Sequence, residues 1–333
     1  MGSRTRIFLT HTPDMRRNLY GERALAGLRA VGDVTLHEGS EALAGEALAQ
    51  AARGCPVIVS DRNTTGVATV FEHSPDLVAF LRCAVDIRNI DVAAASAQGV
   101  LVTQASAGFV DAVSELVFGF MVDLSRGMSR SSAEYHAGKE AAVRGGIQLK
   151  GSTLGVIGYG AIGQRVAAVG AFLGMRVLVS DPVARVAQPN MEQVELDALL
   201  AGSDFVVCLA IANEQTENLM NDAAFARMKR GAYFVNVSRG NLVDEGALAR
   251  ALDSGHLAGA AMDVGRAPDQ KPSLALARRS DVIATPHIAG TTPQAIEHQA
   301  LETVAQAAEI VQGRAPRGAV NAAQASRLAR LAK

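Results

Sequence analysis

The fold is decided by the stretch Thr153-Leu154-Gly155-Val156-Ile157-Gly158-Tyr159-Gly160-Ala161-Ile162-Gly163. An apolar run, Leu154–Ile157, leads into three glycines with the spacing GxGxxG, and a helical pattern starts directly after them. Gly158 permits a tight turn, Gly160 lets the backbone approach a pyrophosphate, and Gly163 lets the helix pack against the strand. The helix N-terminus offers N–H groups and a positive dipole end. This stretch therefore predicts a βαβ unit that binds a dinucleotide.

The next predicted strand, Arg176–Ser180, is followed by Asp181. A carboxylate at this place can accept hydrogen bonds from the ribose hydroxyls of adenosine, and it would repel a 2′-phosphate. We therefore expect NAD as the cofactor, with NADH preferred over NADPH. Arg185 lies four residues further on and could soften that preference.

Short β-like runs alternate with helical patterns along the whole chain. Strands are predicted at Arg6–Thr10, Val34–Leu36, Val57–Ser60, Val100–Thr103, Leu154–Ile157, Arg176–Ser180, Asp204–Leu209, Ala232–Val237, Ala258–Asp263 and Val282–Ala284. Helices are predicted at Glu22–Ala30, Ala42–Arg53, Asp91–Gln98, Asp111–Leu124, from Ile162, and at Pro293–Gln312. A polar stretch at Ser125–Lys150 is interpreted as the passage into a second unit. The alternation predicts an α/β fold with parallel sheets and crossover helices.

Composition narrows the classes of protein that the chain can belong to. Its 333 residues are 49% hydrophobic and carry a net charge of -1, which fits a folded globular chain without the basic surface of a nucleic-acid binder. The longest uncharged stretch, Val92–Val110, is too polar for a membrane span, and the N-terminus lacks the apolar run of a signal peptide. Three cysteines without a CxxC pair predict no structural metal site and a cytoplasmic location.

Three further segments resemble the D-isomer-specific 2-hydroxyacid dehydrogenase family, which includes phosphoglycerate, glyoxylate/hydroxypyruvate and D-lactate dehydrogenases. They are Met228–Gly240, continued by Val243–Leu248, then Leu257–Val264 and Ala284–Gly290. The resemblance implies two doubly wound parallel-sheet lobes of Rossmann or flavodoxin type, with the cofactor lobe inserted into the substrate lobe. The implied boundaries are residues 1–102 plus 291–333 for the substrate domain and 103–290 for the NAD-binding domain. It also implies a homodimer.

Two residues in these segments have the chemistry that reduction of a 2-keto acid requires. Besides a hydride, the reaction needs a cation for the carboxylate and a proton for the carbonyl oxygen. Arg239 can hold a carboxylate with a planar, permanently charged fork. His287 can titrate near neutrality and act as general acid in reduction or general base in oxidation.

The resemblance also assigns binding residues by position. Those implied around the cofactor are Val85, Gly158, Gly160, Ala161, Ile162, Gly163, Asp181, Ala210, Val237, Ser238, Arg239, Asp263, His287 and Gly290. Those implied around the substrate are Ala84, Val85, Asp86 and Arg62.

The sequence departs from the family where a catalytic glutamate normally orients the histidine, five residues after the aspartate matched by Asp263. Pro268 stands at that position, and a one-residue gap would put Ala267 there. Neither side chain can orient a histidine. Asp269 is the nearest carboxylate and a candidate replacement, and Gln270 is a neutral alternative.

The substrate loop departs as well, because Asp86 replaces the second of two glycines that the family uses to bind the substrate carboxylate. A carboxylate near a carboxylate is costly unless it is paired, protonated or turned away. Arg88 is a candidate partner. Of the two arginines that phosphoglycerate enzymes use for the phosphate, only Arg62 is kept, so phosphoglycerate is not favoured.

These features lead us to expect an NAD-dependent oxidoreductase that transfers a hydride between the cofactor and a small D-2-hydroxy acid/2-keto acid pair. The two altered loops keep a second hypothesis open, an NAD(H)-binding sensor or pseudoenzyme of the same fold. A D-amino-acid or phosphite-type dehydrogenase on this scaffold would fit the same residues.

Overall fold

The computed structural model of the chain describes residues 4–332, apart from the side chain of Asp269. The chain forms two compact units. Unit 1 comprises Met1–Gly108 and Pro293–Lys333, and unit 2 comprises Phe109–Thr292, so that unit 2 is an insertion in the sequence of unit 1. Each unit contains one parallel sheet with helical crossovers, which confirms the predicted α/β class.

Unit 1 is built on a five-stranded sheet of order β2-β1-β3-β4-β5. The strands in that order are Asp33–Leu36, Arg6–Leu9, Val57–Ser60, Ala79–Arg82 and Leu101–Gln104. The central strand β3 is buried along its whole length, which explains its unbroken run of Val-Ile-Val. Its neighbour β4 was not predicted from the sequence.

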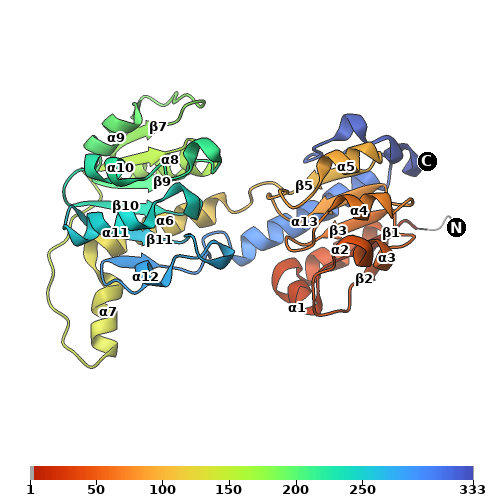
Figure 1. Cartoon of the computed structure of the whole chain (residues 1–333), viewed down its shortest axis with the longest axis horizontal. Helices are drawn as coiled ribbons and strands as arrows, with labels where there is room; N and C mark the ends of the chain where they lie inside the picture. Colours follow the sequence, from red (N-terminus) through yellow and green to blue (C-terminus); the bar gives the residue numbers. More distant parts are fainter. Residues whose placement is uncertain (1–3, 333) are drawn as a thin grey trace. The chain divides into compact units, whose positions relative to one another are not determined.

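The helices of unit 1 come from both parts of the chain (Figure 1). They are α1 (Pro13–Met15), the π-helical turn η1 (Arg16–Tyr20), α2 (Glu22–Val31), α3 (Gly45–Ala51), α4 (Ala68–Glu72), α5 (Val92–Ala97), α13 (Pro293–Ile310), η5 (Ala322–Gln324) and η6 (Ser326–Leu331). The long helix α13 packs against α2, where Val304 lies over Gly27. The C-terminal segment is fixed to the same unit, because Arg327 donates to the backbone carbonyls of Ser74 and Leu77.

Unit 2 is built on a seven-stranded sheet of order β12-β11-β10-β9-β6-β7-β8. The strands in that order are Val282–Ala284, Leu257–Met262, Ala232–Asn236, Phe205–Cys208, Thr153–Ile157, Arg176–Ser180 and Met191–Gln193. The chain begins this sheet at β6, builds outward to β8, and then returns to β9 on the other side of β6. This reversal at β6 is the topological switch point at which open α/β sheets bind ligands.

The helices of unit 2 cover both faces of its sheet (Figure 1). They are α6 (Val110–Arg126), α7 (Met128–His136), α8 (Ala161–Phe172), α9 (Leu196–Gly202), η2 (Glu214–Thr216), α10 (Asp222–Arg227), η3 (Gly240–Leu242), α11 (Glu245–Asp253), η4 (Pro268–Gln270) and α12 (Leu274–Ala277). Helix α7 lies in the stretch Ser125–Lys150, which was interpreted as the passage into a second unit, and none of its residues is buried. That interpretation was wrong, because unit 2 already begins at Phe109 and contains the whole stretch. The edge strand β8 was also missed, because it has no fully buried residue to give it an apolar pattern.

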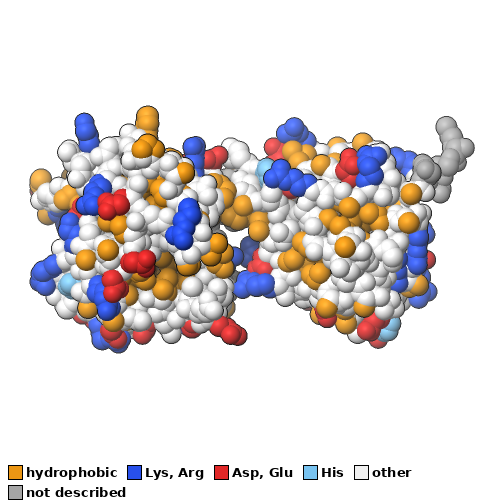
Figure 2. Space-filling model, turned by 90° about the horizontal axis from the view of Figure 1, so that it is seen from above, with side chains coloured by type: hydrophobic (Ala, Val, Ile, Leu, Met, Phe, Trp, Pro, Cys, Tyr) orange, Lys and Arg blue, Asp and Glu red, His pale blue; other side chains and the backbone are white. Residues whose placement is uncertain are grey.

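The surface carries charges of both signs. On the face shown in Figure 2, basic and acidic side chains are interspersed with uncharged ones over both units. Within residues 4–332, no helix is long and apolar enough to cross a membrane.

Candidate active site

The glycine turn of unit 2 follows β6 and leads directly into α8. Gly158 has φ +96°, and a Cβ on it would lie 2.7 Å from the backbone nitrogen of Ala210, so only glycine fits there. A Cβ on Gly163 would overlap the carbonyl oxygen of Gly158. Gly160, by contrast, has open space where a Cβ would stand. Within residues 4–332, no neighbouring atom requires this middle glycine, but a phosphate close to the N-terminus of α8 would require it.

Asp181 follows β7, next to the glycine turn. Its carboxylate accepts the backbone N–H groups of Tyr159 at 2.7 Å, Val183 at 2.8 Å and Ala184 at 2.7 Å. Partial burial alone would raise its pKa, but these hydrogen bonds lower the pKa overall. Asp181 is therefore held as an ionised acceptor close to the turn, which is the chemistry that fits the ribose hydroxyls of NAD. The exposed Arg185 lies on the same loop.

Arg239 lies on the loop after β10, and the backbone of this loop is held from two sides. The fully buried Asn236 donates from its side-chain Nδ2 to the carbonyl of Arg239 at 3.0 Å. Ser238 donates from its hydroxyl to the carbonyl of Ala210 at 2.7 Å, which joins the loops after β10 and β9. The guanidinium of Arg239 donates to the carbonyl of Ser238 at 2.8 Å. Arg239 is thus a cation presented by a braced backbone.

His287 lies on the loop after β12, and Asp263 holds this loop. Asp263 is fully buried, and its carboxylate accepts the hydroxyl of Thr285 at 2.5 Å and the N–H groups of Ile288 at 2.8 Å and Ala289 at 2.9 Å. The N–H of His287 donates to the carbonyl of Asp263 at 2.9 Å. His287 has φ +60°, a conformation that costs a non-glycine residue about 1–3 kcal/mol. The contacts of Asp263 offset this strain and fix the backbone of the histidine.

The segment that replaces the family's glutamate folds into a tight turn around η4. Gly265 donates from its N–H to the carbonyl of Gln270 at 2.8 Å, and Ala267 donates to that of Lys271 at 3.0 Å. Gln270 has φ +55°, and among the described residues its buried side-chain oxygen has no hydrogen-bond partner. The side chain of Asp269 lies outside the described part of the chain, so its role as a replacement acid stays a prediction.

The predicted residues of unit 2 other than Asp269 gather at the carboxyl edge of its sheet. They follow β6 (Gly158, Gly160, Ala161, Ile162, Gly163), β7 (Asp181), β9 (Ala210), β10 (Val237, Ser238, Arg239), β11 (Asp263) and β12 (His287, Gly290). This is the edge at which open α/β sheets bind their ligands. Within residues 4–332, no group of three or more His, Cys, Asp and Glu side chains is placed to hold a metal ion.

The predicted substrate residues lie at the carboxyl edge of the other sheet, in unit 1. Ala84, Val85 and Asp86 follow β4, and the exposed Arg62 follows β3. Arg88 forms a bidentate ion pair with Asp86, with its Nε 3.0 Å and its Nη2 2.5 Å from carboxylate oxygens. The candidate pairing is therefore present, and it leaves the substrate loop without an uncompensated negative charge at this position.

Beneath the substrate loop lies a buried polar cluster that the sequence did not predict. The Asp61 carboxylate accepts the hydroxyls of Thr10 at 2.7 Å and Thr64 at 2.5 Å. Arg82, fully buried, donates to the carbonyls of Asp61 and Thr64 and to the side chain of Asn89 at 2.7 Å. Burial would raise the pKa of Asp61, but the hydroxyl hydrogen bonds lower it overall. The cluster thus ties together the loops after β1, β3 and β4.

Sequence motifs pointed to the residues that would touch a ligand and missed those that hold them. The missed residues are Asn236, Thr285, Arg82 and Asp61. Two of them gave a usable signal, because Asn236 and Arg82 are the last residues of otherwise apolar strands, where a polar side chain reaches the ligand edge.

Sheet order, the glycine turn and the ionised Asp181 together define a dinucleotide-binding protein. The family profile described as "D-isomer specific 2-hydroxyacid dehydrogenase, NAD binding domain" matches residues 118–289. The chain is 34% identical over 289 residues to a D-3-phosphoglycerate dehydrogenase of Haemophilus influenzae, covering 84% of this chain and 70% of that protein. It is 33% identical over 251 residues to a hydroxypyruvate reductase of Thermotoga maritima, covering 74% of this chain and 82% of that protein.

Solved structures agree with the sequence comparison. The structure of a D-2-hydroxyisocaproate dehydrogenase superposes with a TM-score of 0.84 at 26% identity and covers 95% of this chain and 99% of that one. The chain belongs to the D-isomer-specific 2-hydroxyacid dehydrogenase family, as its motifs predicted. It spans about half the length of several other D-3-phosphoglycerate dehydrogenases that it matches.

Proposed function

We propose that the protein is an NAD-dependent oxidoreductase that interconverts a small D-2-hydroxy acid and the corresponding 2-keto acid. The observation that carries the proposal is the gathering of Arg239 and His287 at the same sheet edge as the glycine turn. Arg239 binds the substrate carboxylate through its guanidinium. His287 donates a proton to the carbonyl oxygen in reduction and accepts it in oxidation. When bound, the nicotinamide cofactor supplies or accepts the hydride.

The residues of unit 2 fit a nicotinamide dinucleotide. Gly158, Gly160 and the N-terminus of α8 would hold the pyrophosphate, and Asp181 would accept the adenosine ribose hydroxyls. Val183 and Ile211 are 85% and 81% exposed on the loops after β7 and β9, the two strands that flank β6. Large apolar side chains in this position would be covered by an adenine ring. The ionised Asp181 supports the preference for NADH over NADPH.

We place the substrate among small 2-keto acids. Ala84, Val85 and Asp86 remain the proposed contacts of unit 1, and Arg62 is the one cation kept from the pair that phosphoglycerate enzymes use. The ion pair with Arg88 neutralises Asp86, so the altered loop is compatible with an anionic substrate. This pairing favours an active enzyme over a sensor that has lost its substrate site.

The first test is oxidation of NADH with a panel of 2-keto acids: glyoxylate, hydroxypyruvate, pyruvate, phenylpyruvate, 2-ketoglutarate and phosphohydroxypyruvate. We expect turnover with at least one of them, and His287→Ala should reduce kcat about 10²–10⁴-fold because it removes the general acid. NADH binding without turnover of any member would contradict the enzyme and support the sensor hypothesis. NADPH in the same assay tests the cofactor preference.

We further propose a homodimer in a reducing, cytoplasmic compartment. Apolar side chains of unit 2 stand open on and after α7, among them Tyr135 at 63% and Val143 at 102% exposure. A second copy of the chain would cover them. The three cysteines are all unpaired and buried, as expected where thiols stay reduced. Light scattering of the wild-type chain and of Val143→Glu would test the dimer, since the added charge should favour monomers.

A further inference from the structure

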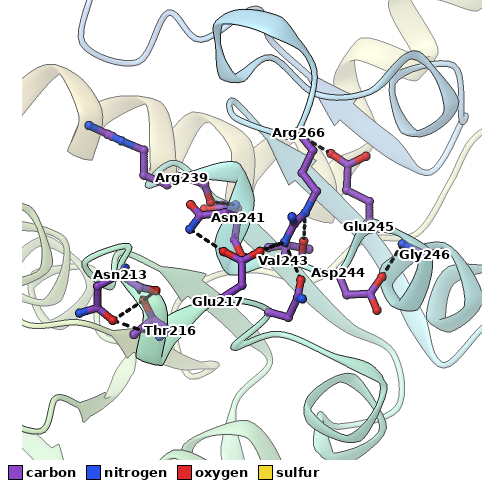
Figure 3. A network of polar contacts seen from close by, with 12 residues as sticks. Asn213, Thr216, Glu217, Arg239, Asn241, Val243, Asp244, Glu245, Gly246 and Arg266 are labelled. Carbon is purple, nitrogen blue, oxygen red and sulfur yellow. Dashed lines mark hydrogen bonds and ion pairs between the residues drawn. The ribbon is translucent and has the colours of Figure 1, made fainter. Parts of the chain in front are cut away.

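Arg266 lies at the centre of a network of polar contacts close to Arg239 (Figure 3). Its Nε donates to the carbonyl of Val243 at 3.0 Å, and its Nη2 donates to the carbonyl of Asn241 at 2.9 Å. Both carbonyls belong to the segment that directly follows Arg239. One guanidinium therefore holds the backbone on which the proposed substrate-binding cation is mounted.

The same guanidinium is also anchored to the segment after η2. Its Nη2 also contacts the carboxylate of Glu217 at 2.8 Å and the side-chain oxygen of Asn218 at 2.5 Å. Asn241 donates from its own side chain to the second carboxylate oxygen of Glu217 at 2.8 Å. Hydrogen bonds from Asn241 and Arg266 lower the pKa of Glu217, so that this group is ionised at neutral pH. The anchor is a charged pair.

The two loops also meet through their backbones. A Cβ on Gly240 would overlap the carbonyl of Gly265, so this close approach requires glycine. The N–H of Arg266 donates to the Glu245 carboxylate at 3.0 Å, and Glu245 is the first residue of α11. The start of α11, the turn at Gly265 and the segment after Arg239 thus form one continuous contact.

The position of Arg239 depends on both ends of its loop. Asn236 holds the carbonyl of Arg239 itself, and Arg266 holds the carbonyls two and four residues further on. The segment is also paired through backbone hydrogen bonds, because Asn218 donates to the carbonyl of Asn241 at 2.9 Å and Met220 donates to that of Leu242 at 2.9 Å. Without Arg266, the carbonyl of Val243 would bond to water, and these backbone contacts would have to hold the far end of the loop without a side chain. A displacement of about 1 Å at a substrate-positioning group can cost about 10²-fold in rate.

We propose that Arg266 is a positioning residue that fixes Arg239 for binding of the substrate carboxylate. This inference rests on the proposed function. Arg266 lies inside the segment 263–270 from which the family's glutamate is missing. That segment therefore still serves the site, through the arginine loop rather than through a carboxylate at the glutamate position.

The test compares Arg266→Ala and Arg266→Lys with Arg279→Ala as the matched control. Arg279 is also a partly exposed arginine of unit 2, with contacts to Asp253 at 2.7 Å and Asp281 at 2.8 Å, but it precedes β12 at the amino edge of the sheet. Hydrogen exchange is followed in peptides that cover residues 237–244, and the KM values for the best 2-keto acid and for NADH are measured separately.

We expect Arg266→Ala to speed exchange in residues 237–244 at least 10-fold and to raise the KM for the keto acid about 10-fold, with the KM for NADH changed less than 2-fold. If Arg266 only stabilised the fold, Arg266→Ala would change the KM for the keto acid and the KM for NADH together, or would change neither. Arg266→Lys should give exchange rates and a KM for the keto acid between those of the wild type and Arg266→Ala, because an ammonium cannot span both carbonyls as the planar guanidinium does. Arg279→Ala should leave both KM values and this exchange as in the wild type.

Two results would overturn the inference: unchanged exchange in Arg266→Ala, or faster exchange with an unchanged KM for the keto acid. If the wild type turns over no keto acid, it is the proposed function that fails. Hydrogen exchange then still decides whether Arg266 holds the Arg239 loop, since it needs no turnover.

Discussion

In each unit, a buried aspartate directly follows one strand of the sheet and accepts hydrogen bonds from threonine hydroxyls and backbone N–H groups. The two aspartates differ in the loops that they hold. Asp61, after β3 of unit 1, is 2% exposed and lies in a cluster with the fully buried Arg82. Asp263, after β11 of unit 2, is fully buried and holds the loop that carries His287. A buried carboxylate thus stabilises a cluster with the charged Arg82 in unit 1, whereas in unit 2 it fixes the loop that carries His287.

The difference lies in what each carboxylate compensates. Asp61 offsets the charge of Arg82, and burial lowers the pKa of Arg82 to about 10. Loss of the Asp61 carboxylate should therefore lower the free energy of unfolding. Asp263 compensates backbone donors and the strained φ of His287, so its loss should appear in catalysis. The following predictions test this division, from the largest expected effect to the smallest.

Asp61→Asn should have the largest effect, and it should affect folding. The substitution keeps the shape and the main-chain carbonyl that Arg82 contacts, but it removes the carboxylate charge that offsets much of the charge of the buried Arg82. Removing one partner of a buried charge pair typically costs about 3–5 kcal/mol. Urea unfolding followed by circular dichroism measures the loss. The double variant Asp61→Asn/Arg82→Met should recover part of it, and a loss that the second substitution deepens would contradict the pairing.

Mild acid should weaken unit 1 through His11. Burial lowers the pKa of His11 from 6.5 to about 4, so between these values the unfolded chain binds the proton and the folded chain does not. The stabilising contribution is complete above pH 6.5 and falls by about 3 kcal/mol as the pH drops to 4. In His11→Phe, the free energy of unfolding measured with urea should depend less on pH between pH 6.5 and 4.5 than in the wild type.

The matched control for that experiment is the exposed His136, whose replacement by Gln should leave the pH dependence as it is in the wild type. If the free energy of unfolding falls equally steeply with pH in His11→Phe and in the wild type, His11 is not the cause of the loss of stability in acid.

Asp263→Asn should act mainly on turnover. The amide would place a donor against the N–H of Ile288 or Ala289, which releases the His287 loop and lowers kcat about 10- to 100-fold. Leaving these donors unpaired should cost about 1–3 kcal/mol of unfolding free energy. Thr285→Val, which removes one hydrogen bond to the same carboxylate, should lower kcat less. A full kcat in Asp263→Asn would break the proposed division.

Asp181→Ser should have the smallest effect on turnover with NADH, and its main effect should be on cofactor choice. Without the carboxylate, the ratio of kcat/KM for NADH to that for NADPH should fall about 10-fold, because the repulsion of a 2′-phosphate is removed. Adding Arg185→Ala should restore part of the ratio if that arginine contacts the phosphate. An unchanged ratio in Asp181→Ser would rule out the carboxylate as the discriminating group.

The strands that the sequence predicted are those whose local pattern is complete. The run Leu154–Ile157 with its three glycines specifies strand, turn and helix without help from distant residues. Strand β4 ends in Arg82, a residue type that usually marks the surface. Its burial depends on acceptors supplied by the loops after β3 and β4, which no local pattern reveals.

The candidate site divides in the same way. Arg239, His287 and the glycines are found by motif because their chemistry is tied to fixed neighbours. The resemblance also assigned Asp263 to the site, but its role in holding the His287 loop was not predicted, and neither were the roles of Asn236 and Arg266. These residues hold backbone from other strands, and such contacts exist only once the parallel sheet brings the strand ends together. The pairing of Asp86 with Arg88 was foreseeable, since two residues apart on a tight loop is within reach of an arginine fork.

The split of unit 1 into two sequence segments has a consequence for how the chain is made. Helix α13 covers α2, and Arg327 secures the turn at Ser74 and Leu77, yet both follow Phe109–Thr292 in the order of synthesis. On the ribosome, unit 2 can emerge complete and fold while the first sheet still lacks its covering helix. The N-terminal strands of unit 1 are thus translated before unit 2 but belong to the unit that matures after it.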